Sequence, residues 1–129
     1  MRKTILYIFI LLSLTAQARD WSRVLKALAT VESRNNPKAV SGDQVGLLQI
    51  RPILVKDCNR ILERRGSNKR YTLRDRYNPV KSREMFVIYQ SQYNPKGNVE
   101  RAIRLWNGGS GYTVRATQGY YNKVRRVMK

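Results

Sequence analysis

Residues 29–52 read ATVESRNNPKAVSGDQVGLLQIRP and carry the clearest succession of structural signals in the chain. A helix that runs into Glu32 should end near residues 35–37, because a residue that precedes proline avoids the helical conformation. Residues 39–45 are polar and rich in turn formers, which predicts a turn-rich insertion. A second helix should cover residues 52–64, since its proline suits the first turn of a helix.

Helical spacing of apolar residues continues on both sides of this stretch. Upstream, Asp20 is a suitable N-cap for the helix that reaches Glu32. Downstream, Asn78 and Asn98 each precede a helical pattern, and Gly109 should end the second of these helices in the left-handed conformation. The remaining assignments are a loop over residues 65–77 and a last helix over residues 114–128. The sequence therefore predicts a small, mainly α-helical domain of about five short helices with a turn-rich insertion.

The first eighteen residues have the pattern of a signal peptide. A positively charged start precedes an apolar run over residues 5–14, and Ala16-Gln17-Ala18 matches a cleavage site. The apolar run is shorter than the roughly 20 residues that span a bilayer as a helix. We therefore expect a signal peptide over residues 1–18 and one domain over residues 19–129, with an uncleaved membrane anchor as the alternative.

Composition limits both the chemistry and the partners of the domain. The chain has no histidine, which excludes Ser-His-Asp and Cys-His catalysis and histidine-ligated zinc. Cys58 is the one cysteine, so no internal disulfide can form, and its apolar neighbours predict a buried thiol. The formal charge is +18, and removing residues 1–18 takes away two positive charges to leave +16, which favours a polyanionic partner.

Basic residues gather in two clusters. The first comprises Arg60, Arg64, Arg65, Lys69, Arg70, Arg74 and Arg76, interleaved with Tyr71 and Tyr77, and the second comprises Lys123, Arg125, Arg126 and Lys129. On composition alone, nucleic acid is the first candidate partner, and a merely solvated surface is the second interpretation. The export signal favours the anionic cell-wall surface instead, so no nucleic acid is expected.

Glu32 is the most informative acidic residue. It follows Leu28 by four residues and Val31 by one, which places it on or beside the apolar face of its helix. A carboxylate there is difficult to ionise, so its pKa should rise, as a general acid near neutral pH requires. From position alone, a boundary glutamate paired with an arginine remains the alternative.

Short motifs follow Glu32 in a defined order. They are Glu32-Ser33, Asn36-Pro37, Ala39, Gly46-Leu47-Leu48-Gln49-Ile50 with Pro52, then Ala102, Asn107-Gly108 after an aromatic, and Thr117, Tyr120 and Val124. In this order and spacing they resemble the catalytic core of the soluble lytic transglycosylases, lysozyme-like enzymes that cut bacterial peptidoglycan. The resemblance covers about residues 22–125 and implies a small lysozyme-like fold.

The resemblance implies that Glu32 is the catalytic acid and base. The family's glutamate protonates the glycosidic oxygen between N-acetylmuramic acid and N-acetylglucosamine. As a carboxylate, it then takes the proton of the muramoyl 6-hydroxyl, which attacks the anomeric carbon and closes a 1,6-anhydro ring. Because water is not the nucleophile, no second carboxylate is needed, in contrast to ordinary glycosidases. We expect neither a cofactor nor a metal.

Three substrate-binding residues are implied close to Glu32. Ser33 would orient the glutamate or the bound sugar, although a serine near a helix end is unremarkable. Gln49 would hydrogen-bond the muramoyl N-acetyl group, since an amide between apolar neighbours is unlikely to serve packing. Gly46 would permit close backbone approach at the cleft wall, with an ordinary turn glycine as the alternative.

Three further substrate-binding residues are implied in the later helices. Asn107 would line the substrate groove, although Asn-Gly-Gly also ends helices, and Tyr120 would hold the glutamate or serve as a core aromatic. Trp106 stands where the family usually has tyrosine, so it can stack on a sugar or fill the core but offers no hydroxyl. Arg51 also departs from the family, which often has an apolar residue there.

Two other functions remain open. A hydrolytic muramidase on the same fold would use water in place of the 6-hydroxyl, with Asp43 as the first candidate to activate it. A non-enzymatic basic binding module would not need Glu32 or Gln49. The preferred hypothesis is an exported transglycosylase of the periplasm or cell envelope that acts on peptidoglycan glycan strands. A further hypothesis is that the protein opens the cell wall for a phage, a secretion machine or a conjugation apparatus.

Overall fold

The computed structural model describes residues 21–129, and within them it contains five α-helices, a 3-10 helix and a two-stranded hairpin. The α-helices are α2 (Ser22–Ser33), α3 (Pro52–Arg64), α4 (Pro79–Tyr93), α5 (Val99–Gly108) and α6 (Val114–Val127). The hairpin is formed by β1 (Val40–Ser41) and β2 (Gln44–Val45), and the 3-10 helix η1 is Leu73–Tyr77. The prediction of a mainly α-helical domain is confirmed. The predicted cap Asp20 and the predicted signal peptide over residues 1–18 lie outside the described residues.

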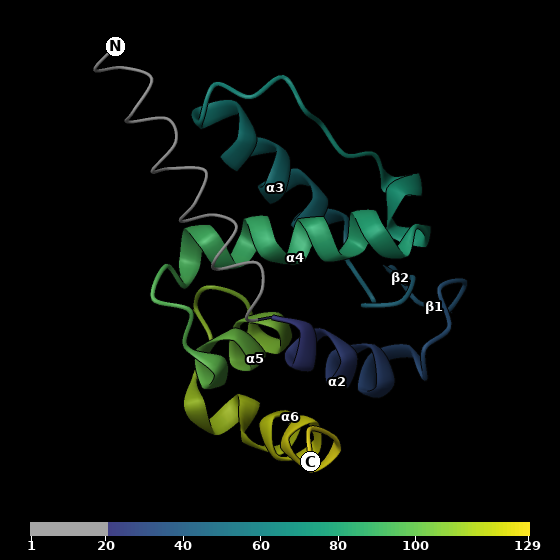
Figure 1. Cartoon of the computed structure of the whole chain (residues 1–129), viewed down its shortest axis with the longest axis vertical. Coiled ribbons are helices and arrows are strands. Elements are labelled where there is room, and N and C mark those ends of the chain that lie inside the picture. The colour runs from purple at the N-terminus through teal and green to yellow at the C-terminus, as the bar shows by residue number, and fades with distance from the viewer. Residues whose placement is uncertain (1–20) are drawn as a thin grey trace.

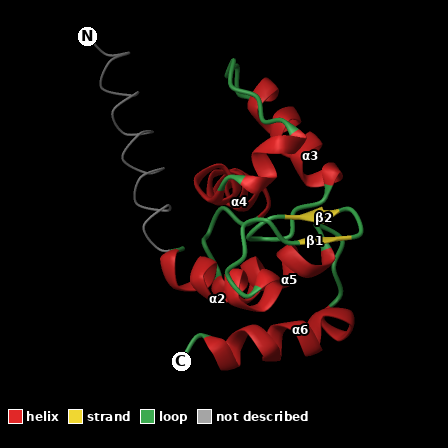
Figure 2. Cartoon of the chain, turned by 90° about the vertical axis from the view of Figure 1, so that its right-hand side faces the viewer, coloured by secondary structure: helices red, strands yellow, loops and turns green. Residues whose placement is uncertain are grey.

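Helix α4 runs across the middle of the fold. Figure 1 shows α3 on one side of α4, α2 and α5 on the other, and α6 beyond these two. Accordingly, α3 packs on α4, whereas α6 packs on α5 and α2. The hairpin lies between the level of α3 and the level of α5 (Figure 2). Within residues 21–129, no helix is both long and apolar enough to cross a membrane.

The helix caps predicted at Asn78 and Asn98 are present. The side chain of Asn78 accepts a hydrogen bond from the Lys81 amide at 3.0 Å, and that of Asn98 accepts one from the Arg101 amide at 2.8 Å. Each bond satisfies an amide that has no partner within the first turn of its helix. Gly109 ends α5 with φ 78° and ψ −178°, so its φ is positive as predicted but its ψ is extended rather than left-handed helical.

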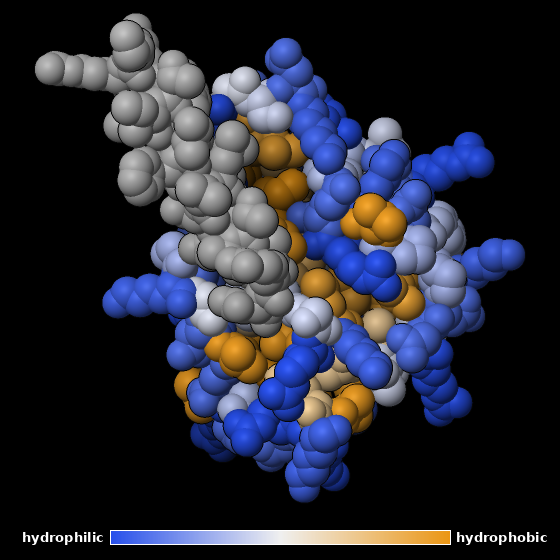
Figure 3. Space-filling view, viewed as in Figure 1, coloured by the Kyte–Doolittle hydropathy of each residue, from blue (hydrophilic) through white to orange (hydrophobic). Residues whose placement is uncertain are grey.

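Aromatic contacts join α2, α4 and α5 in the core. The ring of Phe86 meets Trp21 edge-on at 5.5 Å between centroids and Trp106 at 5.1 Å. Cys58 is fully buried in the same core, as predicted, and burial raises the pKa of its thiol to about 12. On the face shown in Figure 3, the described surface is largely hydrophilic, with smaller apolar patches between the hydrophilic side chains.

The prediction of a loop over residues 65–77 is wrong for its last part, which forms η1. Thr72 and Asp75 cap this helix reciprocally: each side chain accepts a hydrogen bond from the backbone amide of the other residue. The hydrogen bond from the Thr72 amide to the Asp75 carboxylate, at 2.8 Å, is the largest cause of the lowered pKa of that carboxyl. Such a capping box is difficult to recognise in a polar and basic segment, because composition does not show which side chains accept hydrogen bonds from the backbone.

Arg76 belongs to η1 and not, as the sequence indicated, to a solvated basic stretch. Its side chain is buried, with 9% of the residue exposed. The guanidinium donates hydrogen bonds to the carbonyl oxygens of Asp43 at 2.9 Å, Ile50 at 3.1 Å and Leu73 at 2.8 Å. Arginine has five N–H donors, so one side chain satisfies carbonyls from both the hairpin and η1. Arg76 therefore holds the insertion against the rest of the fold.

Candidate active site

A pocket of about 410 Å³ opens beside the C-terminal end of α2. Its lining comes from the end of α2, the hairpin and the residues after it, the first turns of α3, the middle of α4 and the end of α5. These residues are Glu32, Gln44, Gln49, Ile50, Arg51, Ile53, Leu54, Asp57, Tyr89, Leu105, Trp106, Asn107, Gly108, Gly109 and Ser110. The volume is that of a small-molecule or sugar site, and the lining is mainly polar, with aliphatic and aromatic side chains beside the polar groups.

Glu32 lies in the last turn of α2 with its carboxyl in this pocket. The side chain is half-buried, and burial is the main reason that the pKa of its carboxyl is raised above the ordinary value. Three smaller effects oppose burial: a hydrogen bond from Tyr120 and the positive charges of Arg51 and Lys123. The net result is a carboxyl that retains its proton to higher pH than an exposed glutamate does, as a general acid must.

Tyr120 reaches Glu32 from α6, 88 residues further along the chain. Its hydroxyl donates a 2.8 Å hydrogen bond to Oε2 of the carboxyl. The Tyr120 hydroxyl itself is buried, and its pKa is raised by burial and by the neighbouring carboxylate, so it stays protonated and keeps donating. The structure therefore brings these two predicted site residues together.

A buried arginine fixes α6 in the position that this contact requires. Arg104 of α5 is almost wholly buried and donates hydrogen bonds to the Thr117 hydroxyl at 2.9 Å and to the Gln118 amide oxygen at 2.8 Å. It also pairs with Glu100 at 3.0 Å and lies over the ring of Tyr121 at 4.5 Å. Arg104 was not among the predicted site residues, and no local pattern marks it, because its partners Thr117 and Gln118 lie on the next helix.

Ser33 does not line the pocket but ties α2 to the segment that follows the hairpin. The single hydrogen of its hydroxyl is shared between the carbonyl oxygens of Leu47, at 2.7 Å, and Ala29, at 3.1 Å, and the hydroxyl oxygen accepts from the Asn36 amide at 3.1 Å. These bonds leave the hydroxyl engaged with backbone. Through them Ser33 fixes the distance between Glu32 and the pocket wall.

Gly46 also stands behind the pocket wall rather than on it. Its φ is +85°, and a Cβ built there would lie 1.8 Å from the carbonyl oxygen of Arg76. The close backbone approach that was expected at this glycine is therefore made by η1. No side chain fits between these two backbones without displacing one of them.

Gln49 lines the pocket and is held in an uncommon conformation. Its φ is +53°, a left-handed value that is rare for residues other than glycine, asparagine and aspartate. The side-chain nitrogen donates to the carbonyl oxygens of Ala39 at 3.1 Å and Gly46 at 3.0 Å, and only 7% of the residue is exposed. Both amide hydrogens are thus used within the protein, so the carbonyl oxygen is the group that the side chain has left to offer a ligand.

Trp106 and Asn107 form the wall contributed by α5. The indole nitrogen of Trp106 donates to the Leu48 carbonyl oxygen at 3.1 Å, and its ring lies 6.2 Å from that of Tyr89. Trp106 is therefore at once a core residue and a pocket residue. Asn107 lies in the last turn of α5, where it lines the pocket while Gly109 ends the helix.

The second carboxylate in the lining is Asp57 and not Asp43, the candidate named for the hydrolytic alternative. The side chain of Asp43 is 66% exposed and lies outside the pocket, because the hairpin turn carries it into solvent. Asp57 faces the pocket from α3, one turn after Ile53, and accepts a 2.9 Å hydrogen bond from the Tyr93 hydroxyl. Helical spacing places Asp57 on the same face of α3 as Ile53, but the sequence does not show that this face meets the pocket.

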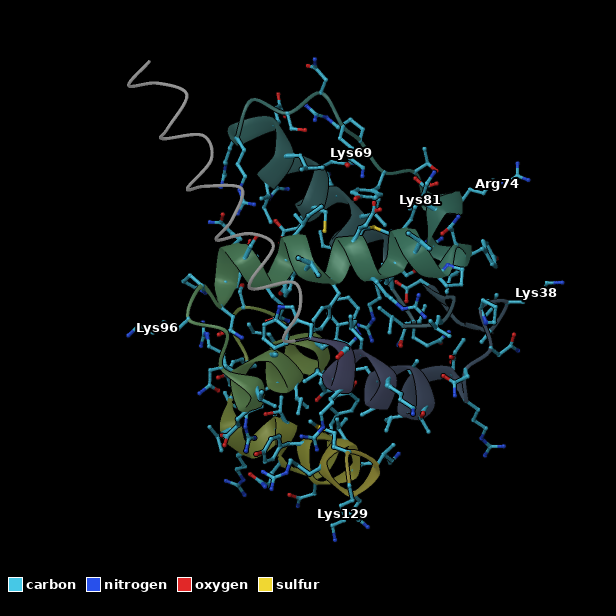
Figure 4. The ribbon with its side chains drawn as sticks, viewed as in Figure 1. Lys38, Lys69, Arg74, Lys81, Lys96 and Lys129 are labelled. Carbon is cyan, nitrogen blue, oxygen red and sulfur yellow. The ribbon has the colours of Figure 1, made fainter. Side chains whose placement is uncertain are left out.

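Basic side chains project from many parts of the surface. Of those that Figure 4 labels, Lys38, Arg74, Lys96 and Lys129 point outward, whereas Lys69 pairs with Glu84 and Lys81 with Asp75. A second, open hollow of about 800 Å³ is lined by Arg23, Val99, Tyr121, Asn122, Arg125, Arg126, Met128 and Lys129. None of its four cations takes part in an ion pair with a described residue, so no neighbouring carboxylate neutralises the positive charge that lines this hollow.

Comparison with known proteins agrees with this geometry. The family model of the transglycosylase SLT domain matches residues 11–128, nearly the whole chain. No curated protein matches the sequence significantly. The helices, the small hairpin and the extent of the match are those expected of a lysozyme-like domain of this kind. The chain therefore belongs to the transglycosylase SLT domain family, and this membership implies a peptidoglycan-cleaving transglycosylase of the cell envelope.

Proposed function

We propose that the protein is a lytic transglycosylase that cleaves the bond between N-acetylmuramic acid and N-acetylglucosamine with Glu32 as its acid and base. The observation that carries this proposal is the half-buried carboxyl of Glu32, a pocket residue that has a raised pKa and accepts a hydrogen bond from Tyr120. A protonated carboxyl in this position can give its proton to the leaving glycosidic oxygen.

Both steps of the reaction use the same carboxyl. In the first, the glycosidic bond breaks and its electrons go to the oxygen, which receives the Glu32 proton and leaves as a hydroxyl. In the second, the carboxylate takes the proton of the muramoyl 6-hydroxyl, whose oxygen bonds to the anomeric carbon and closes the 1,6-anhydro ring. The proton gained by Glu32 restores its starting form. Neither step consumes water or a cofactor.

The other pocket residues hold the sugar for this reaction. Because the Gln49 amide hydrogens are occupied, its carbonyl oxygen accepts the N–H of the muramoyl N-acetyl group. Trp106 presents an aromatic surface for the sugar ring, and Asn107 supplies a polar contact beside it. Ser33 and Gly46 act indirectly, since they fix the backbone that carries Gln49.

Products distinguish this proposal from hydrolysis. Purified residues 19–129 should release 1,6-anhydromuramoyl fragments from bacterial peptidoglycan, detected by mass spectrometry. Reducing muramoyl ends would instead mean that water is the nucleophile, and Asp57 would be the first group to test as its activator, because it lines the pocket and Asp43 does not. The Asp57 carboxyl already accepts the hydrogen bond from the Tyr93 hydroxyl and pairs with Arg60 at 3.7 Å, so it is engaged within the protein, which supports the transglycosylase reaction.

Replacing Tyr120 should change both the rate and its dependence on pH. The hydroxyl favours the carboxylate form of Glu32, so Tyr120→Phe should raise the pKa of Glu32 further. The reaction needs the protonated form, so its rate falls as pH rises through this pKa, and in the variant that fall should move to higher pH. The maximal rate should drop about tenfold, because the carboxyl loses a charge-assisted hydrogen bond that orients it.

The measurement is kcat/KM against pH, with Tyr121→Phe as the matched control. Tyr121 also lies on α6, but its hydroxyl accepts from Arg125 at 2.8 Å instead of contacting Glu32. Both variants lose one hydroxyl from the same helix. An unchanged pH profile in Tyr120→Phe would show that the hydroxyl does not act on the catalytic carboxyl.

We also propose that the protein is exported. The second hollow, which is lined by Arg23, Arg125, Arg126 and Lys129 among others, would then retain it on the anionic cell wall. Replacing Arg125 and Arg126 by glutamine should weaken binding to insoluble peptidoglycan, most clearly below about 0.15 M salt, where screening is limited. Replacing Arg64 and Arg65 removes the same charge from the end of α3 and is the control. Equal losses in the two double variants would mean that net charge, and not the hollow, governs retention.

A further inference from the structure

Arg51 is the one cation among the residues that line the catalytic pocket. The side chain is 60% exposed, and its ion pair with Asp43 is loose, with 3.8 Å between Nε and Oδ1. Exposed pairs of this kind contribute little, because solvent screens them and the side chains lose entropy when they are held together. The guanidinium is therefore available to a ligand at the mouth of the pocket.

The backbone holds Arg51 in a fixed place despite this exposure. It is the N-cap residue of α3 with φ −86° and ψ 156°, and Pro52 follows at the first helical position. Its carbonyl oxygen accepts a hydrogen bond from the Leu54 amide at 3.1 Å. On the other side, Ile50 exchanges two backbone hydrogen bonds with Val45, at 2.9 and 3.1 Å. An arginine anchored on both sides can present its donors in a reproducible position.

The sugar rings of the substrate carry no negative charge that could pair with a cation. The N-acetyl and hydroxyl groups are neutral, whereas the negative charge of a peptidoglycan strand is borne by the carboxylates of the peptide stem on the muramoyl lactyl group. A guanidinium binds a carboxylate by up to two parallel hydrogen bonds, a geometry that matches its planar fork. The positive charge of Arg51 also works against the protonated form of Glu32, so the sugar chemistry alone gives no reason for an arginine here.

We propose that Arg51 is a specificity-determining residue that binds a stem-peptide carboxylate of the muramoyl residue in the pocket. The inference rests on the proposed cleavage with Glu32 as acid and base. It adds that the enzyme recognises the stem peptide as well as the glycan. It follows that the enzyme favours strands that carry peptides with free carboxylates. Neutralising these carboxylates removes the contact while leaving the glycan intact.

The test combines two substrates with two enzymes. Soluble peptidoglycan fragments are used as prepared or after their carboxylates have been coupled to methylamine, and kcat/KM is measured for the wild type and Arg51→Gln. The wild type should lose about tenfold on the amidated substrate, the range of a partly exposed charge-assisted contact. Arg51→Gln should show the same low value on both substrates. Arg51→Lys keeps the positive charge but not the planar fork, so its kcat/KM on the untreated substrate should lie between the values of the wild type and Arg51→Gln.

Lys123→Gln is the matched control for long-range charge. Lys123 also lowers the pKa of Glu32 but does not line the pocket, so this variant should retain the tenfold preference. All rates are compared on the acid side of each pH profile, where Glu32 is protonated in every variant. This comparison separates binding of the carboxylate from a change in the acidity of Glu32.

The outcomes separate this inference from the proposed function. If the wild type makes anhydromuramoyl products from both substrates at equal rates, the role of Arg51 is refuted and the catalytic proposal stands. An equal tenfold loss in wild type, Arg51→Gln and Lys123→Gln would also refute it, because general attraction to anions would then explain the preference. Absence of anhydromuramoyl products from the untreated substrate would refute the catalytic proposal itself.

Discussion

Glu32→Gln should lower the rate of anhydromuramoyl product formation by about 10²–10⁴-fold, the range of a general acid–base group. Glutamine keeps the size of the side chain and can still accept the hydrogen bond from Tyr120, but it cannot give a proton to the glycosidic oxygen. Folding should be unaffected, because a neutral amide is easier to bury than a carboxylate. Initial rates by mass spectrometry and a thermal unfolding curve test both statements.

Glu63→Gln is the control for this substitution. Glu63 is an exposed glutamate of α3 that does not line the pocket, so its loss should leave the rate within about twofold, as surface changes away from a site usually do. A Glu32→Gln protein that is folded and still active would remove Glu32 from the mechanism. The pocket holds one other carboxylate in its lining, Asp57, and that residue would then have to be examined.

Gly46→Ala should destabilise the protein by roughly 2–5 kcal/mol, the largest effect on stability that we expect from a single methyl group. Two penalties add at this position. The new Cβ would lie 1.8 Å from the Arg76 carbonyl oxygen, which is backbone and cannot rotate away, and a φ of +85° is unfavourable for alanine. The expected fall in Tm exceeds about 10 °C, and thermal unfolding followed by circular dichroism measures it.

Gly42→Ala separates the two penalties. Gly42 has a similar positive φ of +61°, but a Cβ there would meet no atom within 4 Å. Its cost should therefore be only about 1 kcal/mol, the conformational part alone. If the two variants were equally stable, the approach of η1 to Gly46 would not constrain the fold. Activity should fall with stability only in Gly46→Ala, because this glycine is adjacent to the segment that carries Gln49.

Local signals were sufficient to predict the helices. Asn78 and Asn98 were identified as caps because a short polar side chain before a helical pattern can bond the free amides of the first turn, and both do so. Pro52 marked the start of α3 for an equally local reason. The 3-10 helix after Thr72 escaped prediction, because its capping box is embedded in a basic run that resembles an ordinary loop.

The site was predicted only in part. Glu32, Gln49, Trp106 and Asn107 do line one pocket, whereas Ser33 and Gly46 stand behind its wall. Their roles toward a substrate remain predictions. Asp57 was overlooked, because helical spacing alone did not show which face of α3 meets the pocket.

The sequence by itself determined where the helices begin and end and which glutamate adjoins an apolar helix face, because caps, prolines and periodicity act over a few residues. Only the tertiary structure decided what surrounds that glutamate. Tyr120 reaches it across 88 residues, and Arg76 reaches carbonyl oxygens 26 and 33 residues away. The acidity of Glu32 depends on burial and on charges that packing brings together, and packing joins parts of the chain whose proximity no local pattern records.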